Sequence, residues 1–366
     1  MTLEEPPIRF GIVGSGWRSE FFLRIAEALP ERFAVTGLVT RNPETARTIE
    51  SRWGVHAHAD IAGLRATEPP EFVVVSVPES VAASMIEQLV ALGMPVLTET
   101  PPAANVAGLS ALYERVAGRG IVQVAEQYHL SPILNAQIAI ARSGRIGEIS
   151  QVLVAQCHDY HGISVMRRAL GVGAEDATIT SSTFQYRLLQ GPERDGDPVD
   201  EQFVTARQTV AQFDFGDRLG RYDFAPEQYF SWIRGNRLLV RGDRGEIDNL
   251  EVRYAKDYRT PVFTHLRRVM AGEGGNLEGL FLRGLLFGEE WAFSNPFIPA
   301  RLNDDEIAIA LMLIGMRTKI AGGPDIYSLA EASQDQYLAL LMQQAEQTGL
   351  AVRSTPQVWA NDLMAQ

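Results

Sequence analysis

The stretch IRFGIVGSGWRSEFF, residues 8–22, joins an apolar run to a glycine-containing turn and then to a segment with helical periodicity. Gly14 and Gly16 occupy the first two positions of a G-x-G-x-x-G motif, whose third position holds Ser19. In such a turn the first glycine permits a sharp bend and the second lets the backbone approach a pyrophosphate, while the following helix offers unpaired N–H groups to the phosphates. The turn taken alone is equally compatible with a purely structural bend.

The surroundings of the turn favour dinucleotide binding. It follows a predicted strand, precedes a predicted helix, and belongs to a βαβ unit whose second strand arrives about 20 residues later. Ser19 is small enough to let the helix pack close to the strand. The predicted cofactor contacts at this turn are Gly11, Gly14, Ser15, Gly16, Trp17 and Arg18.

Short apolar runs alternate with helix-period segments along the first 125 residues. The predicted strands are residues 8–13, 33–39, 72–77, 95–99 and 120–125. The predicted helices are residues 17–29, 43–54, 79–93 and 105–118. Continuous Val and Ile runs separated by helices indicate a parallel sheet that is covered on both faces. We predict an α/β fold whose amino-terminal domain, residues 1–125, is a doubly wound Rossmann domain.

The pattern changes after residue 126, where one helix precedes a series of strands. The predicted elements are a helix at 131–144 and strands at 150–158, 178–189, 208–224, 229–255 and 259–269. Gly-Asp and Gly-Asn turns between consecutive strands indicate antiparallel pairing. The glycine-rich segment 272–288 is predicted to be an irregular connection, and two helices, 303–323 and 328–349, close the chain. We predict that residues 126–366 form an α+β domain for substrate binding and oligomerisation.

Composition excludes several classes of function. The chain of 366 residues is 46% hydrophobic and 21% charged, as expected of a globular protein. Its formal net charge of −12 argues against sequence-independent nucleic-acid binding, which relies on Lys and Arg. The single cysteine, Cys157, excludes an internal disulfide and suits a reducing compartment. With no signal-peptide pattern and no apolar stretch near the ~18 residues that span a bilayer, we expect a cytoplasmic protein that binds a small molecule.

The end of the second predicted strand indicates which dinucleotide binds. NAD-specific sites usually carry Asp or Glu there for the ribose 2′-hydroxyl, whereas this chain has Thr40 and Arg41. A threonine hydroxyl and a guanidinium suit a 2′-phosphate, so we expect NADP to be preferred over NAD. Arg41 could instead be a solvated loop cation. Val77 and Pro78, which end the third predicted strand, are further predicted cofactor contacts.

Several other segments occur in an informative order along the chain. They are VVVSVPESVAASMIEQLVALGMPVLTETPPA (73–103), ARSGRIGEISQV (141–152), HGISVMRRALG (161–171), VRGDRGEI (240–247) and SLAEASQDQYLALLMQQAEQTGLAV (328–352). Together with the glycine turn they resemble the Gfo/Idh/MocA oxidoreductases, named after glucose-fructose oxidoreductase, inositol dehydrogenase and a rhizopine catabolism protein. The resemblance implies a carboxy-terminal domain with an open, mainly antiparallel sheet. It also implies a nicotinamide-dependent reaction of a sugar or polyol, and a homodimer or homotetramer formed through that sheet.

The chain departs from the family pattern at three polar positions. The family usually has E-K-P after the fourth Rossmann strand, with its lysine near the nicotinamide, whereas this chain has Glu99, Thr100 and Pro101. The family's H-x-x-D pattern maps onto HGIS, which keeps His161 but has Ser164 in place of the aspartate. The histidine often found after the third-strand turn is Ala82. Glu99 and Thr100 are still expected beside the cofactor.

Histidine side chains remain as candidates for proton transfer. His161 is the predicted general acid/base, because an imidazole exchanges protons near neutral pH. His158 and Tyr160 are the other predicted catalytic residues, and Asp159, Tyr128 and His129 are predicted substrate contacts. Tyr128 and His129 are equally compatible with packing. Without a nearby third ligand, His158 and His161 predict no metal site.

The leading interpretation is an NADP-preferring oxidoreductase of a sugar, polyol or related carbonyl compound. The main alternative is a dinucleotide-binding protein that has lost turnover and acts as a sensor, because Thr100, Ser164 and Ala82 replace polar groups. A third interpretation is a net non-redox reaction with transient oxidation by the cofactor.

Overall fold

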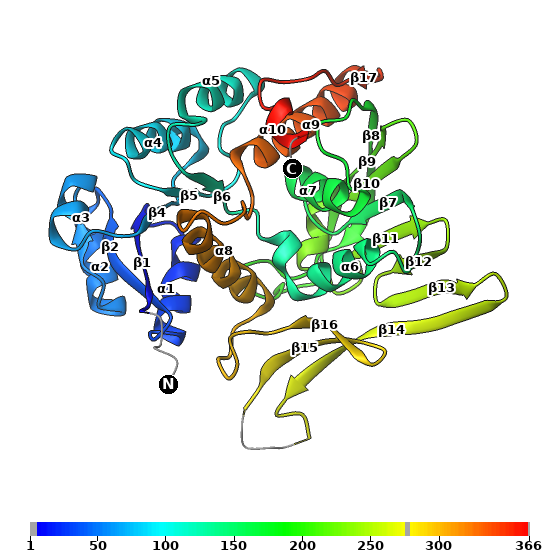
Figure 1. The fold of residues 1–366 in the computed structure, drawn as a ribbon, viewed down its shortest axis with the longest axis horizontal. Helices are drawn as coiled ribbons and strands as arrows, with labels where there is room; N and C mark the ends of the chain where they lie inside the picture. Colours follow the sequence, from blue (N-terminus) through cyan, green and yellow to red (C-terminus); the bar gives the residue numbers. More distant parts are fainter. Residues whose placement is uncertain (1–5, 275–278, 365–366) are drawn as a thin grey trace. The chain divides into compact units, whose positions relative to one another are not determined.

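The computed structural model describes residues 6–274 and 279–364, and the chain in it separates into two compact units (Figure 1). The first unit comprises Met1–Pro132, Val269–Gly284 and Ser294–Ser333. The second unit comprises Ile133–Arg268, Leu285–Phe293 and Gln334–Gln366. Each unit is therefore assembled from separate stretches of the sequence. The domain boundary that the sequence predicts after residue 125 stays a prediction.

The first unit is built on a parallel sheet. Within the described residues it has six strands in the order β3-β2-β1-β4-β5-β6. The strands are β1 (Ile8–Val13), β2 (Phe33–Val39), β3 (Ala57–His58), β4 (Phe72–Val75), β5 (Val96–Thr98) and β6 (Val122–Val124). All four side chains of β4 are buried, as a sheet covered on both faces requires. The strand order reverses between β1 and β4, and doubly wound sheets bind their ligands at such a reversal.

Helices connect these strands and are fixed by local capping interactions. They are α1 (Ser19–Ala28), α2 (Pro43–Trp53), α3 (Ile61–Thr67), α4 (Glu79–Ala91) and α5 (Val106–Val116). The Asn42 side chain accepts from the backbone N–H of Glu44 at 2.9 Å, and the left-handed Gly54 ends the same helix. The predicted strands and helices of this region are confirmed. The sequence pattern missed β3 and α3, which are too short to show a period.

A later segment of the chain completes the first unit. The short 3₁₀ helix η1 (Tyr128–Leu130) follows β6, and helix α8 (Asp304–Ile320) packs against α1. A capping box begins α8, in which Asn303 and Glu306 satisfy each other's backbone N–H groups. Glu306 also accepts from Arg24 Nε at 2.7 Å, which ties α8 to α1. These contacts attach α8 to the Rossmann sheet although the segments lie far apart in the sequence.

Most of a larger, mainly antiparallel sheet belongs to the second unit. Among the described residues this sheet has eleven strands in the order β16-β15-β14-β13-β12-β11-β7-β10-β9-β8-β17, and β7 and β10 pair in parallel. The strands are β7 (Ile149–Ala155), β8 (Thr178–Leu189), β9 (Phe203–Asp214), β10 (Leu219–Phe224), β11 (Arg237–Gly242), β12 (Gly245–Asp248), β13 (Glu251–Asp257), β14 (Thr260–Ala271), β15 (Phe281–Phe287), β16 (Glu290–Ser294) and β17 (Val352–Arg353). The predicted fold class is confirmed.

Helices cover one face of this sheet, and the other face is open. The helices are α6 (Pro132–Arg142), α7 (Asp159–Leu170), α9 (Leu329–Thr348) and α10 (Ala360–Met364). Along β9, Ala211 and Phe213 are buried, whereas the alternate residues Val210 and Gln212 are exposed. An antiparallel sheet tolerates such a solvated face.

Several strand predictions need correction. The stretch 208–224 belongs to two strands, β9 and β10, and the predicted Gly-Asp turn joins them at Gly216, whose φ is 93°. The stretch 229–255 contains β11, β12 and β13 after the 3₁₀ helix η2 (Pro226–Tyr229). The segment 272–288 is not irregular throughout, because it forms β15, with Phe281, Leu282 and Leu285 buried. Residues 275–278 of that segment lie outside the described residues.

Candidate functional site

The glycine turn after β1 combines one glycine that the fold requires with one that it does not. Gly14 has φ +110°, and a Cβ built on it would lie 1.9 Å from the carbonyl oxygen of Ser76, so no other residue fits. Gly16 has no such constraint, since its φ is outside the left-handed region and a Cβ on it would meet no atom within 4 Å. Gly16 is exposed, and its lack of a side chain leaves the turn open to an approaching ligand. This arrangement fits a pyrophosphate.

Serine and tryptophan complete the turn. Ser19, in the position of the motif's third glycine, is buried and donates to the carbonyl oxygen of Gly14 at 3.1 Å. The hydroxyl therefore stabilises the bend from inside the helix. Trp17 is 55% exposed and contacts the edge of the Phe21 ring, with 5.4 Å between ring centroids. Gly11 lies on β1 against Leu64, where a Cβ would approach the leucine side chain to 2.7 Å.

The end of β2 lies beside the same turn. The hydroxyls of Thr40 and Ser15 are hydrogen-bonded at 3.1 Å, and the Thr40 backbone N–H donates to His58 at 3.0 Å. The structure thus brings together two predicted cofactor contacts that are separated by 24 residues in the sequence. Arg41 is exposed, and its guanidinium forms no hydrogen bond or ion pair with the described residues.

An ion pair joins the glycine turn to the end of β5. Arg18 Nε donates to Glu99 Oε1 at 3.0 Å, and each side chain is only 15% exposed. Burial disfavours the charged guanidinium, but the charge of Glu99, its hydrogen bond with Arg18 and the charge of Asp305 more than offset this effect and raise the pKa of Arg18. The predicted contacts Arg18 and Glu99 therefore form one electrostatic pair.

The other predicted residues of the first unit contribute no charge at this edge. Thr100 is uncharged and Ala82 is buried in α4, so neither supplies the polar group that the family pattern would have. Val77 and Pro78 lead from β4 into α4, with Pro78 at its N-cap. His129 is buried, and its ring is tilted against that of Tyr327 with 5.1 Å between the ring centroids, so its predicted contact with the substrate stays a prediction.

The predicted catalytic residues of the second unit surround the start of α7. Strand β7 ends at Ala155, earlier than predicted, and His158 is the N-cap of α7. The ring centroid of His161 is 4.8 Å from that of His158 and 4.4 Å from that of Tyr160. The rings of His158, Tyr160 and His161 therefore lie together, with His161 buried on the first turn of the helix.

Two tyrosines that the sequence analysis did not identify hold this helix start. The Tyr229 hydroxyl lies 2.6 Å from His158 Nδ1 and accepts from the His158 backbone N–H at 3.0 Å. The Tyr222 hydroxyl accepts from the Asp159 backbone N–H at 2.9 Å. Tyr229 lies 71 positions from His158 and Tyr222 lies 63 positions from Asp159 in the sequence, and Tyr229 falls within a stretch predicted as strand, so no local motif marks them.

Burial dominates the electrostatics around α7. Burial, together with the neighbouring His161, lowers the pKa of His158 to about 4, so this ring is neutral at pH 7. Burial also raises the pKa of Asp159, and the charge of Glu346 adds to that effect against the opposing His161 and Arg207. Glu346 and Arg207 form an ion pair with each other. Neither residue was predicted as part of a site.

Ser164 does not take the place of the missing aspartate. Its side chain is fully buried and donates to the carbonyl oxygen of His161 at 2.8 Å, within the same helix. Gly162, which directly follows His161, lies so close to β10 that a Cβ built on it would come within 2.6 Å of the Tyr222 ring. The first turn of α7 is therefore held by backbone and ring contacts.

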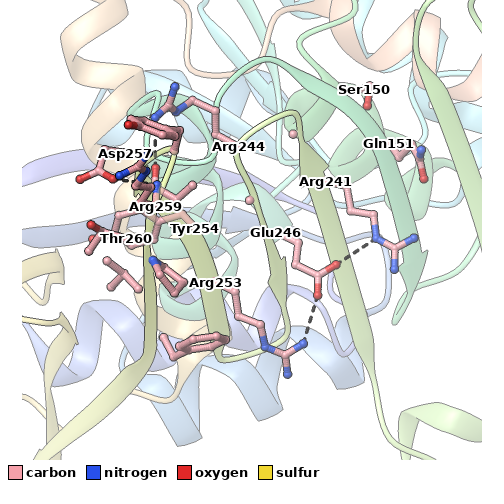
Figure 2. Close-up of a pocket in the computed structure, with 17 residues that line it drawn as sticks. Ser150, Gln151, Arg241, Arg244, Glu246, Arg253, Tyr254, Asp257, Arg259 and Thr260 are labelled. Atoms are coloured by element: carbon pink, nitrogen blue, oxygen red, sulfur yellow. Dashed lines mark hydrogen bonds and ion pairs between the residues drawn. The ribbon is translucent and has the colours of Figure 1, made fainter.

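The open face of the large sheet carries a second polar feature. A hollow of about 590 Å³ lies along β11, β12, β13 and β14, and Figure 2 shows the side chains that line it. Arg241 and Arg253 both contact Glu246, at 3.0 and 3.2 Å, and Phe263 is paired with Arg253 across the β13–β14 ladder. The alternate residues Val240, Ile247 and Val252 are fully buried, so these charged residues lie on the face away from the core.

Comparison with protein-family models identifies the amino-terminal region. Residues 8–128 match the model of the Gfo/Idh/MocA oxidoreductase family with an NAD-binding Rossmann fold. A comparison with curated proteins gives no match. Across the described residues, no helix is long and apolar enough to cross a membrane.

Solved structures share the fold over almost the whole chain. An oxidoreductase from Agrobacterium radiobacter in complex with NAD⁺, L-tartaric acid and magnesium is 16% identical, with a TM-score of 0.66, covering 94% of this chain and 98% of its own. Levoglucosan dehydrogenase in complex with NADH is 17% identical, with a TM-score of 0.69, covering 96% and 100%. Myo-inositol dehydrogenase from Corynebacterium glutamicum is 16% identical, with a TM-score of 0.64, covering 96% and 99%.

Proposed function

Through residues 8–128 the chain belongs to the Gfo/Idh/MocA family of NAD-binding oxidoreductases, and on that premise we propose that it is an NADP-preferring dehydrogenase or reductase of a sugar, polyol or related carbonyl compound. The observation that carries this proposal is the open turn at Gly16, where the fold itself requires no glycine. When bound, the nicotinamide cofactor exchanges a hydride with the carbinol carbon of the substrate.

The tip of β2 supports the preference for NADP. Thr40 is fixed against the turn by Ser15, and the exposed Arg41 guanidinium is not engaged by the described residues. No carboxylate occupies either position to accept from a ribose 2′-hydroxyl. A 2′-phosphate would find a hydroxyl donor and a cation here. The solved relatives of this fold include complexes with NAD⁺ and NADH, so the preference itself is the part to test.

His161 is proposed as the general acid/base. Oxidation of a carbinol requires that the hydroxyl proton pass to a base, and a buried imidazole can take that proton. His158 is less suited to this role because its pKa of about 4 makes it a weak proton acceptor. We assign His158 the task of holding the first turn of α7 through Tyr229, with Tyr160 packed against the reacting imidazole. Tyr128 and Asp159 remain proposed substrate contacts.

The nature of the solved relatives supports the substrate class. Levoglucosan dehydrogenase and myo-inositol dehydrogenase are named for an anhydrosugar and a cyclic polyol. A ring hydroxyl of this type presents the carbinol carbon and proton that the proposed chemistry needs. Cyclic sugars and polyols are therefore the first compounds to screen.

A second candidate function is dinucleotide binding without turnover. Thr100 and Ala82 are uncharged, and Ser164 is engaged within its own helix, so three groups that would assist catalysis are absent. A sensor would keep the open turn at Gly16 and lose the chemistry. The two functions differ in whether hydride transfer follows binding.

The experiment that tests the proposal is a calorimetric titration of the protein with NADPH and NADH, followed by a turnover screen against cyclic sugars and polyols. Gly16→Val should fold normally, because a Cβ at this position would meet no atom within 4 Å, and it should raise the Kd of both cofactors more than tenfold. His161→Gln should remove turnover and leave cofactor affinity unchanged, with His265→Gln, an exposed histidine, as the control. Cofactor binding without turnover would favour the sensor, and no binding at all would refute both functions.

We further propose that the open sheet face joins copies of this chain into a homodimer or homotetramer. Phe263 is 73% exposed on that face beside the arginine-lined hollow of Figure 2. Exposed apolar patches rimmed by polar residues mark contact surfaces, and Tyr258, 84% exposed, lines the same hollow as Phe263. Phe263→Glu should shift the mass measured by light scattering toward the monomer, and a monomeric parent protein would contradict the proposal.

A further inference from the structure

The ion pair between Arg18 and Glu99 lies at the edge of the sheet where ligands bind. Arg18 follows β1 and Glu99 follows β5, and β4 separates these strands in the sheet. The pair therefore crosses the carboxyl edge of the sheet at the reversal of strand order. Buried ion pairs add little net stability, because desolvation offsets the attraction between the charges. A role in ligand binding would account for its position.

The pair belongs to the nicotinamide half of the cofactor site, an argument that rests on the proposed function. In doubly wound folds the turn after the first strand holds the pyrophosphate, and the end of the second strand contacts the adenosine ribose. The other half of the dinucleotide then lies toward β4, β5 and β6. Glu99 follows β5, and Tyr128 follows β6.

Most of the donors of Arg18 remain available. A guanidinium has five N–H donors, and Arg18 gives the one on Nε to Glu99. Its two terminal nitrogens form no hydrogen bond with the described residues. Thr100, directly after Glu99, is uncharged. Arg18 is thus a cation that the structure places against the end of β5, with donors left for a ligand.

We propose that Arg18, held in place by Glu99, supplies the positive charge of the reaction centre and donates to the substrate oxygen. On the proposed function, the carbinol carbon would give a hydride to the bound oxidised nicotinamide, the hydroxyl would give its proton to a general base, and the C–O single bond would become C=O. Negative charge grows on the oxygen as the proton leaves, and a fixed guanidinium stabilises that charge. Arg18 itself transfers no proton, because its pKa is raised above an already high value.

The test compares the binding of oxidised and reduced cofactor, which does not depend on turnover. Only the oxidised nicotinamide carries a positive charge. Arg18→Met leaves the Glu99 carboxylate unpaired, which favours the positively charged NADP⁺, so the ratio of the Kd for NADP⁺ to the Kd for NADPH should fall about tenfold. Glu99→Gln leaves Arg18 unpaired, which disfavours NADP⁺, so the same ratio should rise about tenfold. Arg24→Met is the matched control, because Arg24 lies on α1, whose N-cap is Arg18, and both guanidinium groups lie over the Phe21 ring. The Kd ratio of this variant should not change.

The outcomes separate this inference from the proposed function. If Arg18→Met weakens the binding of NADP⁺ and of NADPH equally, Arg18 is a phosphate ligand and the inference is overturned. An unchanged Kd ratio in both variants would also overturn it. A wild-type protein that binds neither form would instead refute the proposed function, and the inference with it.

A kinetic measurement tests the contact with the substrate oxygen. With a sugar or polyol from the turnover screen, Arg18→Met should lower kcat/KM by about 10²–10³, the usual loss for one oxyanion donor. Thr100→Lys in the Arg18→Met background should recover part of this loss, because it returns a cation to the end of β5. An Arg18→Met variant with wild-type kcat/KM would exclude the contact with the substrate.

Discussion

Replacing Arg41 with alanine should weaken the binding of NADPH and leave the affinity for NADH almost unchanged. Arg41 is exposed at the tip of β2 and is not engaged by the described residues, so its removal disturbs no packing. Two unit charges about 4 Å apart attract by about 1 kcal/mol in water and about 4 kcal/mol near a protein surface. Because Arg41 is solvated, the lower part of this range applies, and a loss of about 1–2 kcal/mol corresponds to about 5- to 30-fold in Kd.

Calorimetric titration of both cofactors at two salt concentrations measures this effect. The advantage of NADPH over NADH in the wild-type protein should shrink as salt rises, since exposed charges are screened. Arg47→Ala on α2 is the control, because it removes another exposed arginine six residues further along the chain. Equal weakening of NADPH and NADH by Arg41→Ala, or the same effect from Arg47→Ala, would refute the assignment of Arg41 to the 2′-phosphate.

Two further predictions concern stability in the second unit. Asp335→Asn removes a carboxylate partner of Arg167, and both side chains are at most 3% exposed, so the free energy of unfolding measured with urea should fall by about 3 kcal/mol. Asp248→Asn, in the half-exposed pair with Arg237, should lower it by less than about 1 kcal/mol. Equal losses in the two variants would contradict this reasoning. The folded-state pKa of His158, about 4, lies below its ordinary 6.5, so between these pH values the unfolded chain binds more protons than the folded chain. The free energy of unfolding therefore falls as the pH drops from 6.5 to 4, by at most about 3 kcal/mol. His158→Gln should remove this part of the pH dependence measured by thermal unfolding, and an unchanged profile between pH 6.5 and 4 would show that His158 keeps its ordinary pKa.

The sequence predicts the Rossmann elements well because their signals are local. Continuous apolar runs such as 33–39 coincide with strands, and Asn42 and Gly54 mark the ends of α2. The family prediction is confirmed by the match over residues 8–128. The errors fall where no local signal exists, as with the two-residue β3, or where composition misleads, as with the glycine-rich segment that contains β15.

The candidate site divides in the same way. The motif located Gly14 and Gly16, and strand topology located Thr40 and Arg41, because these positions follow directly from a βαβ unit. The partnership of Arg18 with Glu99 could not be predicted, since it joins residues 81 apart through side chains of ordinary surface types. Tyr222 and Tyr229 were missed for the same reason, because only the folding of the large sheet brings them to α7.

The close approach of Gly162 to Tyr222 has a consequence for engineering this protein. A single added methyl group at residue 162 would collide with the ring at 2.6 Å and with the carbonyl oxygen of Cys157 at 3.0 Å. The first turn of α7 can therefore hardly shift toward β10, and its histidine keeps a fixed distance from the sheet beneath. Libraries intended to change substrate range should leave residues 158–162 intact and vary neighbouring loops, where a new side chain can be accommodated without moving the helix.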